Sequence, residues 1–302
     1  MAVDAEAIHT SMEQLLEARH IDGDTALLTG LVGRGIQASR SPIMHELEAQ
    51  RLGIRHAYIL IDFDKLGLPD DALSTVLTTA RKLGFRGLNI THPFKTQVIP
   101  FLDTLSPEAS AARAVNTVVF EPAGTVGHNT DIWGFGESLR QKLADVPRKR
   151  VVQFGAGGAG AAVAYALCQF GVEELIIIDA VNARAEALAS SLNGFNGCRI
   201  TAGADASAIQ SADGVVNTTP VGMSKYPGMP FDVDMLRPHH WVADVIYFPL
   251  ETELIRSASA IGCRTMPGIG MAIGQAVRAF ELFTGRAADM QQMTAHFEAV
   301  QA

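Results

Sequence analysis

A glycine-rich segment lies between two apolar runs in the middle of the chain. Its glycines are Gly155, Gly157 and Gly160, and they directly follow the apolar run 151–154. In such a segment one glycine permits a tight turn, the next lets backbone approach a pyrophosphate, and the last lets a helix pack on the strand. The free N–H groups and the dipole at that helix N-terminus favour negative charge. The spacing therefore predicts a dinucleotide site. The residues expected to form it are Gly155, Ala156, Gly157, Gly158 and Ala159.

An acidic residue closes the second apolar run. Asp179 directly follows the run 175–178, about twenty residues after the glycines. The dinucleotide fingerprint requires an acidic residue at this distance, whereas a plain strand–helix turn does not. A carboxylate there can accept hydrogen bonds from a ribose 2′-OH but would repel a 2′-phosphate. Ala180 and Val181 offer a phosphate no partner. Arg184 could pair with one, but it could equally order the loop or stack on adenine. We therefore expect NAD in preference to NADP.

A second group of polar side chains follows predicted strands in the first half of the chain. Asn89, Thr91 and Lys95 come at the end of a strand expected at 87–90, and Asn116 and Asp131 flank a predicted hairpin. Buried polar groups need partners, and ligands of open α/β sheets bind beyond the carboxyl ends of the strands. These residues are therefore candidates for a ligand site, although Asp131 could equally serve only as a helix N-cap.

Two serines precede the next predicted helix. Ser39 and Ser41 follow a strand expected at 27–32, and Pro42 suits the first turn of a helix with Ser41 as its N-cap. A turn and a cap would explain one serine but not both, so the pair is a further candidate for ligand binding.

Composition limits the class of protein. The chain has 302 residues, enough for two domains, and a net charge of -8 without a dense basic run, which argues against a nucleic-acid surface. We expect no membrane span, no secretory signal and no metal site, and buried reduced thiols at Cys168, Cys198 and Cys263. A cytoplasmic enzyme with a small-molecule substrate is the expected class.

Strands and helices alternate on both sides of a domain boundary that we expect near the helix at 132–144, and residues 147–149 introduce the dinucleotide unit. Residues 1–24 are expected to add a packing helix without chemistry. The pattern predicts two α/β domains with mostly parallel sheets. Strands are expected at 27–32, 56–63, 87–90, 115–120, 125–130, 151–154, 175–178, 199–201, 214–217 and 241–247, and helices at 70–83, 132–144, 161–170, 251–261 and from about 271 to 283.

These motifs occur in the order found in shikimate dehydrogenases, which the chain resembles from about residue 27 onward. Likeness to the NAD-preferring quinate/shikimate branch lies in residues 87–95, 213–222 and 244–253 and in Asp179. The matching motifs are Ser39-x-Ser41-Pro42, Asn89-x-Thr91-x-Pro93-x-Lys95, Ala114-Val115-Asn116-Thr117, Asn129-Thr130-Asp131, Gly155-Ala156-Gly157-Gly158-Ala159 and Gly270-Met271-x-x-x-Gln275.

The resemblance implies reversible hydride transfer between NAD and the C3 position of shikimate and 3-dehydroshikimate. By motif position, Lys95 and Asp131 match the catalytic pair and also contact the substrate, and Asn89 looks like support behind the site. Reduction of a ketone develops alkoxide charge, so an ammonium donor such as Lys95 suits that role. The other expected substrate contacts are Ser39, Ser41, Thr91, Asn116, Tyr247 and Gln275, and the other expected cofactor contacts are Val245 and Gly268.

Two departures from the family pattern bear on specificity. Asp179-Ala180-Val181 replaces the Asn-Arg-Thr-like phosphate clamp of NADP-using members, which supports NAD. Ser41 stands where members that accept quinate well tend to carry threonine, which favours shikimate. The alternatives are a quinate or aminoshikimate-type dehydrogenase, which would share every motif, and an NAD-binding sensor without turnover.

The expected domain plan is discontinuous. Residues 1–130 would form the substrate domain, residues 131–267 a Rossmann-like NAD domain, and residues 268–302 helices that return to the substrate domain. A homodimer is a possible assembly.

Overall fold

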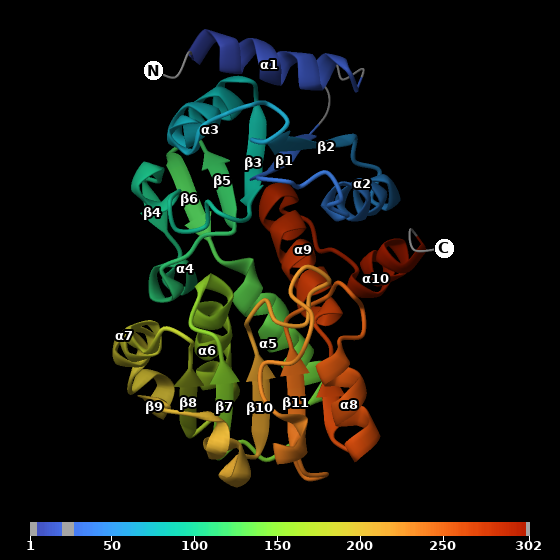
Figure 1. Ribbon diagram of the computed structural model, residues 1–302. Helices are drawn as coiled ribbons and strands as arrows, with labels where there is room; N and C mark the ends of the chain where they lie inside the picture. Colours follow the sequence, from blue (N-terminus) through green and yellow to red (C-terminus); the bar gives the residue numbers. More distant parts are fainter. Residues whose placement is uncertain (1–4, 20–26, 300–302) are drawn as a thin grey trace. The chain divides into compact units, whose positions relative to one another are not determined.

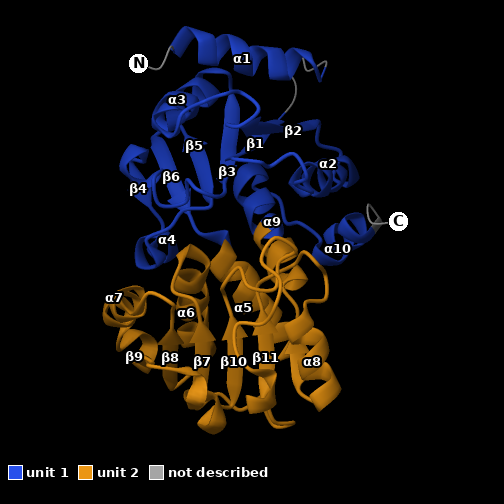
Figure 2. Cartoon of the chain, viewed as in Figure 1, with its two compact units in different colours: residues 1–130, 276–302 blue, residues 131–275 orange. Residues whose placement is uncertain are grey.

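The computed structural model describes residues 5–19 and 27–299, and its fold is α/β throughout. Contacts divide the chain into two compact units (Figure 2). Unit 1 comprises Met1–Thr130 and Ala276–Ala302, and unit 2 comprises Asp131–Gln275. Both chain ends thus belong to unit 1, and unit 2 is an insertion in the sequence of unit 1.

Unit 1 is built on a mixed six-stranded sheet in the order β2-β1-β3-β5-β6-β4 (Figure 1). Parallel pairs join β1 to β2 and β3, whereas the hairpin β5–β6 runs antiparallel and extends the sheet from β3. This arrangement brings the carboxyl end of β3 beside the amino end of β5. The strands are β1 (Leu27–Gly33), β2 (His56–Asp62), β3 (Phe85–Ile90), β4 (Thr104–Leu105), β5 (Thr117–Glu121) and β6 (Gly124–His128).

Helices cover this sheet and complete its core. On one side α1 packs against α3, burying Ile8, Met12 and Leu16 in a cluster with Val76 and Ala80. On β5, Val119 packs against Ala279 and Phe283 of α9. The helices are α1 (Ala5–Glu17), α2 (Ser41–Arg51), α3 (Leu73–Lys82), α4 (Pro107–Ala112), α9 (Ile269–Thr284) and α10 (Met290–Ala299), and α9 begins in unit 2.

Unit 2 is a wholly parallel six-stranded sheet in the order β12-β11-β10-β7-β8-β9. The chain order reverses at β7, so β8 and β10 lie on its two sides, and ligands of doubly wound sheets bind at such a reversal. The strands are β7 (Arg150–Phe154), β8 (Glu174–Ile178), β9 (Arg199–Ala202), β10 (Gly214–Asn217), β11 (Trp241–Asp244) and β12 (Arg264–Met266), and the helices are α5 (Thr130–Lys142), α6 (Gly158–Phe170), α7 (Asn182–Leu192) and α8 (Glu253–Ile261).

The predicted α/β fold class is confirmed, with local corrections. In unit 1 the predicted hairpin joins the sheet beside β3, so the pairs β3–β5 and β5–β6 are antiparallel. The strand expected at 241–247 ends at Asp244, and the helix expected at 70–83 begins as a 3₁₀ turn over Asp70–Ala72. Ser41 is not an N-cap: α2 begins at Ser41 itself, and Arg40 occupies the cap position without a side-chain bond. Residues 1–4 and 20–24 of the expected N-terminal helix lie outside the described residues.

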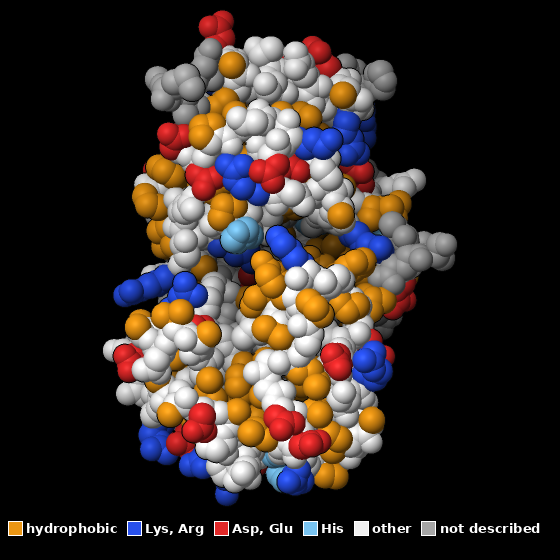
Figure 3. Space-filling model, in the orientation of Figure 1, with side chains coloured by type: hydrophobic (Ala, Val, Ile, Leu, Met, Phe, Trp, Pro, Cys, Tyr) orange, Lys and Arg blue, Asp and Glu red, His pale blue; other side chains and the backbone are white. Residues whose placement is uncertain are grey.

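The surface carries charges of both signs. On the face shown in Figure 3, acidic and basic side chains are interspersed and neither sign forms a continuous patch. None of the helices within 5–19 and 27–299 combines the length and apolarity that crossing a bilayer requires. The three cysteines are buried and free, as expected.

Candidate active site

A buried cluster of polar side chains lies where β3 ends and β5 begins. The amide of Asn116 is its centre: Oδ1 accepts the backbone N–H of Thr130 at 2.8 Å, and Nδ2 donates to the Thr130 hydroxyl at 3.0 Å. Asn89 donates from Nδ2 to the hydroxyl of Thr117 at 2.9 Å. Each of these four side chains is at most 6% exposed. Two of the predicted polar residues, Asn89 and Asn116, are therefore parts of one hydrogen-bonded cluster.

Lys95 and Thr91 lie on the segment that leaves β3. Thr91 N donates to Val32 O at 3.0 Å, and Val115 N donates to Lys95 O at 2.8 Å. The fully buried ring of Phe94 anchors the same turn in the core. The backbone of Lys95 is thus tied to the residue that precedes Asn116, and the partly buried Lys95 side chain starts from a fixed position.

Ser39 and Ser41 lie on the loop that joins β1 to α2. Ser39 Oγ donates to Ser41 Oγ at 3.3 Å and accepts from Ser41 N at 3.3 Å, so the two hydroxyls are neighbours. Both side chains are partly buried. The structure brings together the pair that the sequence singled out.

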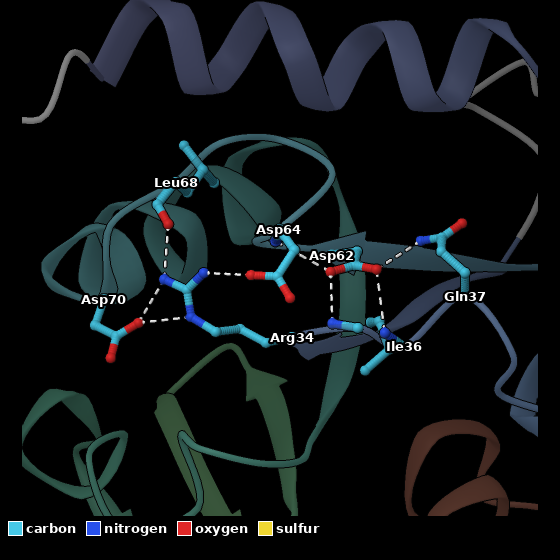
Figure 4. Close-up of polar contacts among 8 residues, drawn as sticks. Arg34, Ile36, Gln37, Asp62, Asp64, Leu68 and Asp70 are labelled. Carbon is cyan, nitrogen blue, oxygen red and sulfur yellow. Dashed lines mark hydrogen bonds and ion pairs between the residues drawn. The ribbon is translucent and has the colours of Figure 1, made fainter.

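The loop before these serines is held by Asp62, at the end of β2 (Figure 4). Its carboxylate accepts the backbone N–H groups of Gly35 and Ile36 at 3.0 and 3.1 Å and Gln37 Nε2 at 2.9 Å. Burial alone would raise the pKa of Asp62, but these bonds and one from Asp64 N hold it below its usual range. The ionised carboxylate therefore fixes the path of the chain toward Ser39.

Arg34 stabilises the other side of the same loop. Its guanidinium contacts Asp64 at 2.7 Å, Asp70 at 2.6 Å and the Leu68 carbonyl at 2.8 Å. Asp62 and Arg34 were not among the predicted site residues. The apolar run before Asp62 ends in an acid, but nothing in the sequence indicates that this acid accepts N–H groups from a loop 25 to 27 residues earlier.

Asp131 and Gln275 are held by two helices that cross at glycines within unit 2. A Cβ on Gly134, one turn after Asp131, would lie 2.6 Å from Gln275 N and Met271 O, and one on Gly274 would lie 2.8 Å from Gly134 Cα. The backbones of α5 and α9 are therefore in direct contact. Asp131 is 6% exposed in the first turn of α5, and Gln275 donates from Nε2 to Ala272 O at 3.0 Å.

The glycine turn after β7 has the geometry that its spacing predicts. Gly155 adopts a positive φ of 101°, and the Thr218 hydroxyl donates to the carbonyls of Phe154 and Gly155 at 2.8 and 3.0 Å. A Cβ on Gly160 would collide with the carbonyl of Gly155, whereas one on Gly157 would meet nothing within 4 Å. The third glycine is thus required for packing, and the second leaves room above the N-terminus of α6.

The N-cap of that helix is Gly157, which has no side chain to bond the free N–H groups. The N-terminus of α6 therefore has the features of an anion site: exposed backbone at Gly157 and Gly158, open space, and the positive end of the helix dipole. These residues fit a pyrophosphate.

Asp179 stands at the end of β8 beside this turn. Its Oδ2 accepts Ala156 N at 2.8 Å, and its Oδ1 accepts Val181 N at 2.8 Å. Val181 is 48% exposed, and Arg184 is an exposed residue in the first turn of α7. The carboxylate is thus fixed against the loop that would hold the dinucleotide.

The remaining predicted residues lie after β11. Val245 N donates to Asn217 O at 3.1 Å, and Gly268 packs so closely against the Val245 carbonyl that a Cβ would collide with it. These two cofactor candidates are neighbours. Tyr247 is 48% exposed. Nearby Asp244 is a buried acceptor that bonds Ile246 N, Asn217 Nδ2 and Thr252 Oγ1, and burial raises its pKa to about 6.

Comparisons with known proteins place these two units in one family. A family model described as the shikimate dehydrogenase substrate binding domain matches residues 31–118, and one described as the shikimate 5′-dehydrogenase C-terminal domain matches residues 268–296. A shikimate dehydrogenase (NADP(+)) of Streptomyces avermitilis is 52% identical over 89% of this chain and 94% of its own. A quinate/shikimate dehydrogenase (NAD(+)) of Corynebacterium efficiens is 49% identical over 90% and 98%. This chain belongs to the shikimate dehydrogenase family.

A solved structure agrees. The quinate dehydrogenase of Corynebacterium glutamicum in complex with NAD superposes with a TM-score of 0.85 and 45% identity, over 91% of this chain and all of that one. The protein is therefore an oxidoreductase of the shikimate/quinate dehydrogenase type that uses a nicotinamide dinucleotide and a small-molecule substrate. Relatives in the shikimate dehydrogenase family are named for NAD and for NADP, so their names do not decide which of the two cofactors this enzyme prefers.

Proposed function

We propose that the enzyme prefers NAD and transfers hydride between it and the C3 position of shikimate and 3-dehydroshikimate. The cofactor preference rests on Asp179, whose two oxygens already accept Ala156 N and Val181 N. A carboxylate held in this way offers its remaining lone pairs to ribose hydroxyls and repels a 2′-phosphate.

The neighbours of Asp179 support the same choice. Ala180 and Val181 carry no donor on their side chains, so they cannot replace the clamp that a 2′-phosphate needs. Arg184 is the cation nearest in sequence, and its exposed side chain could reach a phosphate or lie over an adenine ring. We propose that Asp179 outweighs Arg184, because the carboxylate is fixed and the arginine side chain must lose rotamer freedom to bind.

The proposed chemistry needs a proton donor at the reacting oxygen. The cofactor supplies or accepts the hydride. When the ketone is reduced, its oxygen gains negative charge, and the Lys95 ammonium would stabilise this charge and deliver the proton. Asp131 would orient Lys95 and hold the neighbouring hydroxyl. The other substrate contacts that we propose are Ser39, Ser41, Thr91, Asn116, Tyr247 and Gln275.

Quinate is the second candidate substrate. Ser41 leaves slightly more space than threonine, which favours shikimate, but one methyl group discriminates by only about 1–3 kcal/mol. The names of the Corynebacterium relative and of the superposed structure favour quinate. We propose shikimate as the better substrate because Ser41 belongs to this chain itself.

The assignment of unit 1 to the substrate and unit 2 to the dinucleotide is part of the proposal. It agrees with the glycine turn and Asp179 lying in unit 2 and with Ser39, Ser41, Lys95 and Asn116 lying in unit 1. A homodimer and a cytoplasmic location remain predictions from the sequence.

Initial rates for four combinations test the proposal: shikimate and quinate, each with NAD⁺ and with NADP⁺. The highest kcat/KM is expected for shikimate with NAD⁺. A higher value with NADP⁺ would mean that Arg184 overrides Asp179, and a higher value with quinate would mean that Ser41 does not set the preference. No rate in any combination would point to aminoshikimate-like substrates or to a sensor without turnover.

A further inference from the structure

A continuous chain of buried side-chain hydrogen bonds runs through unit 1 beneath the proposed substrate residues. The Tyr58 hydroxyl donates to Asn89 Oδ1 at 2.8 Å, Asn89 Nδ2 donates to Thr117 Oγ1 at 2.9 Å, and Thr117 Oγ1 donates to Asn116 Oδ1 at 3.1 Å. Tyr58 and Thr117 are fully buried. The chain crosses β2, β3 and β5, so it joins strands that are far apart in the sequence.

This series of bonds ends at a residue that we assign to the substrate. Asn116, its last member, is bonded to Thr130, which directly precedes Asp131. Tyr58, its first member, is linked to Asn116 through Asn89 and Thr117, although Tyr58 is itself wholly covered.

Two backbone groups fix the direction of these bonds. Thr130 N–H can only donate, so the atom of Asn116 that faces it must be the oxygen, and Thr117 donates to that oxygen. The backbone carbonyl of Asn116 can only accept, so the atom of Asn89 that faces it is Nδ2, which also donates to Thr117. This leaves Asn89 Oδ1 facing the Tyr58 hydroxyl, which donates to it.

We infer that Tyr58 is a positioning residue for substrate binding, because its hydroxyl orients Asn89, Thr117 and Asn116. With this order in place, Asn116 keeps a second Nδ2 hydrogen for a ligand. Without the hydroxyl, Asn89 Oδ1 is buried with no donor, and an amide rotation there would propagate to Asn116. The inference rests on the proposed function of Asn116.

Tyr58→Phe tests it, because phenylalanine keeps the ring and removes only the hydroxyl. We expect KM for the preferred substrate to rise about tenfold, the factor equivalent to one buried hydrogen bond, with kcat within about threefold. The Kd for NAD⁺, measured by fluorescence, should stay unchanged. Tyr165→Phe is the matched control: it removes a hydroxyl from a buried tyrosine of unit 2 that stacks on Phe195, and it should leave KM unchanged.

Thr117→Val breaks the same chain at another point and keeps the test open if Tyr58→Phe folds poorly. Since both variants disrupt one chain, the double variant should raise KM by less than the product of the single effects. An unchanged KM in folded Tyr58→Phe or Thr117→Val, or effects that multiply, would overturn the inference alone. A wild-type enzyme that turns over neither shikimate nor quinate would overturn the proposed function and this inference with it.

Discussion

The carboxylate of Asp179 combines two tasks in one side chain. It accepts two loop N–H groups, so it stabilises the loop, and in the proposed cofactor site its negative charge would repel a 2′-phosphate. Removal of the charge should therefore affect cofactor choice more than folding, provided that an acceptor oxygen remains.

Asp179→Asn should shift preference toward NADP⁺. We expect the ratio of kcat/KM for NADP⁺ to that for NAD⁺ to rise at least tenfold, because the amide no longer repels a phosphate. Its single oxygen can still accept one of the two loop N–H groups. Asp232→Asn is the matched control: Asp232 also accepts the N–H two residues later, from Asp234 at 3.0 Å, but it precedes β11 rather than following a strand of the sheet. An unchanged ratio in Asp179→Asn would show that Asp179 does not select the cofactor.

Lys95 is proposed to act in the chemical step. Lys95→Ala should lower kcat by about 10²–10⁴-fold, the usual contribution of a positioned acid–base group, while KM changes only a few fold. Lys82→Ala, at the end of α3, removes an exposed lysine of the same unit and should leave both constants unchanged. If kcat of Lys95→Ala stays within a few fold of wild type, Lys95 is a binding residue only.

Sequence patterns identified candidate site residues better than they identified the groups to which these residues are hydrogen-bonded. The glycine turn was found from its spacing, the serine pair from an excess over what a turn and a cap need, and Asn89 and Asn116 from their places at strand ends. Each forms a compact group. Asp62 and Tyr58 were missed, because a single acid or tyrosine at a strand is ordinary in a sequence. Their importance depends on N–H groups and amides that only the folded sheet brings to them.

The predicted end of a strand was wrong where a side chain accepts a hydrogen bond from the backbone nearby. Residues 241–247 are apolar enough for a longer strand, but Asp244 Oδ1 accepts Ile246 N at 3.0 Å, which turns the chain away from the sheet. Strands β4 and β12 are two and three residues long, too short to show a period. The contact between α5 and α9 was not predicted, since glycine spacing alone does not indicate which helices meet.

The close contact of α5 and α9 at Gly134 and Gly274 leads to a prediction about how these two helices pack. Gly134→Ala would bring a Cβ to 2.6 Å from backbone atoms of α9, so the helices must move apart. We expect unfolding free energy to fall by about 1–3 kcal/mol, as for an overpacked core, and KM for the substrate to rise, because Asp131 and Gln275 lie on these helices. Urea denaturation and initial rates measure the two effects.

Gly136→Ala is the matched control, two residues further along α5. Its Cβ would meet only the Arg140 side chain, at 3.7 Å, so the gain in helix propensity should leave stability equal or raise it by about 0.5–1 kcal/mol. Equal stability of Gly134→Ala and Gly136→Ala would mean that the two helices tolerate separation.

Acid should act in opposite directions on two sets of buried groups, the histidines His45 and His56 of unit 1 and the carboxylate of Asp244 in unit 2. In unit 1, burial lowers the pKa of His56 to about 4 and that of His45 well below its usual value, and the two rings lie 6.2 Å apart. Both nitrogens of His45 lack a hydrogen-bond partner among the described residues. In unit 2, burial raises the pKa of Asp244 to about 6. Protonation is thus unfavourable in the folded core of unit 1 and favourable at Asp244.

The signs follow from proton linkage. Between pH 6.5 and about 4, His56 is protonated in the unfolded chain but not in the folded one. The free energy of unfolding therefore decreases as the pH is lowered, and His56 alone reduces it by about 2 kcal/mol at pH 5. Between pH 6 and its unfolded value of 3.8, Asp244 is protonated only in the folded state, so its contribution to stability rises as pH falls. Unit 1 should therefore open more readily at pH 5 than at pH 7, while Asp244 opposes this trend in unit 2.

Hydrogen exchange can measure the stability of each unit separately, because it reports the opening of each strand without assuming one cooperative transition. We compare each variant with wild type at the same pH, so that intrinsic exchange rates cancel. His45→Leu should protect β1–β3 relative to wild type at pH 5 more than at pH 7, because it removes a buried group that acid must charge. Asp244→Asn should leave β1–β3 unchanged and make β10 and β11 relatively less protected at pH 5 than at pH 7. A His45→Leu difference in β1–β3 that is the same at both pH values would show that the buried histidines do not set the acid response of unit 1.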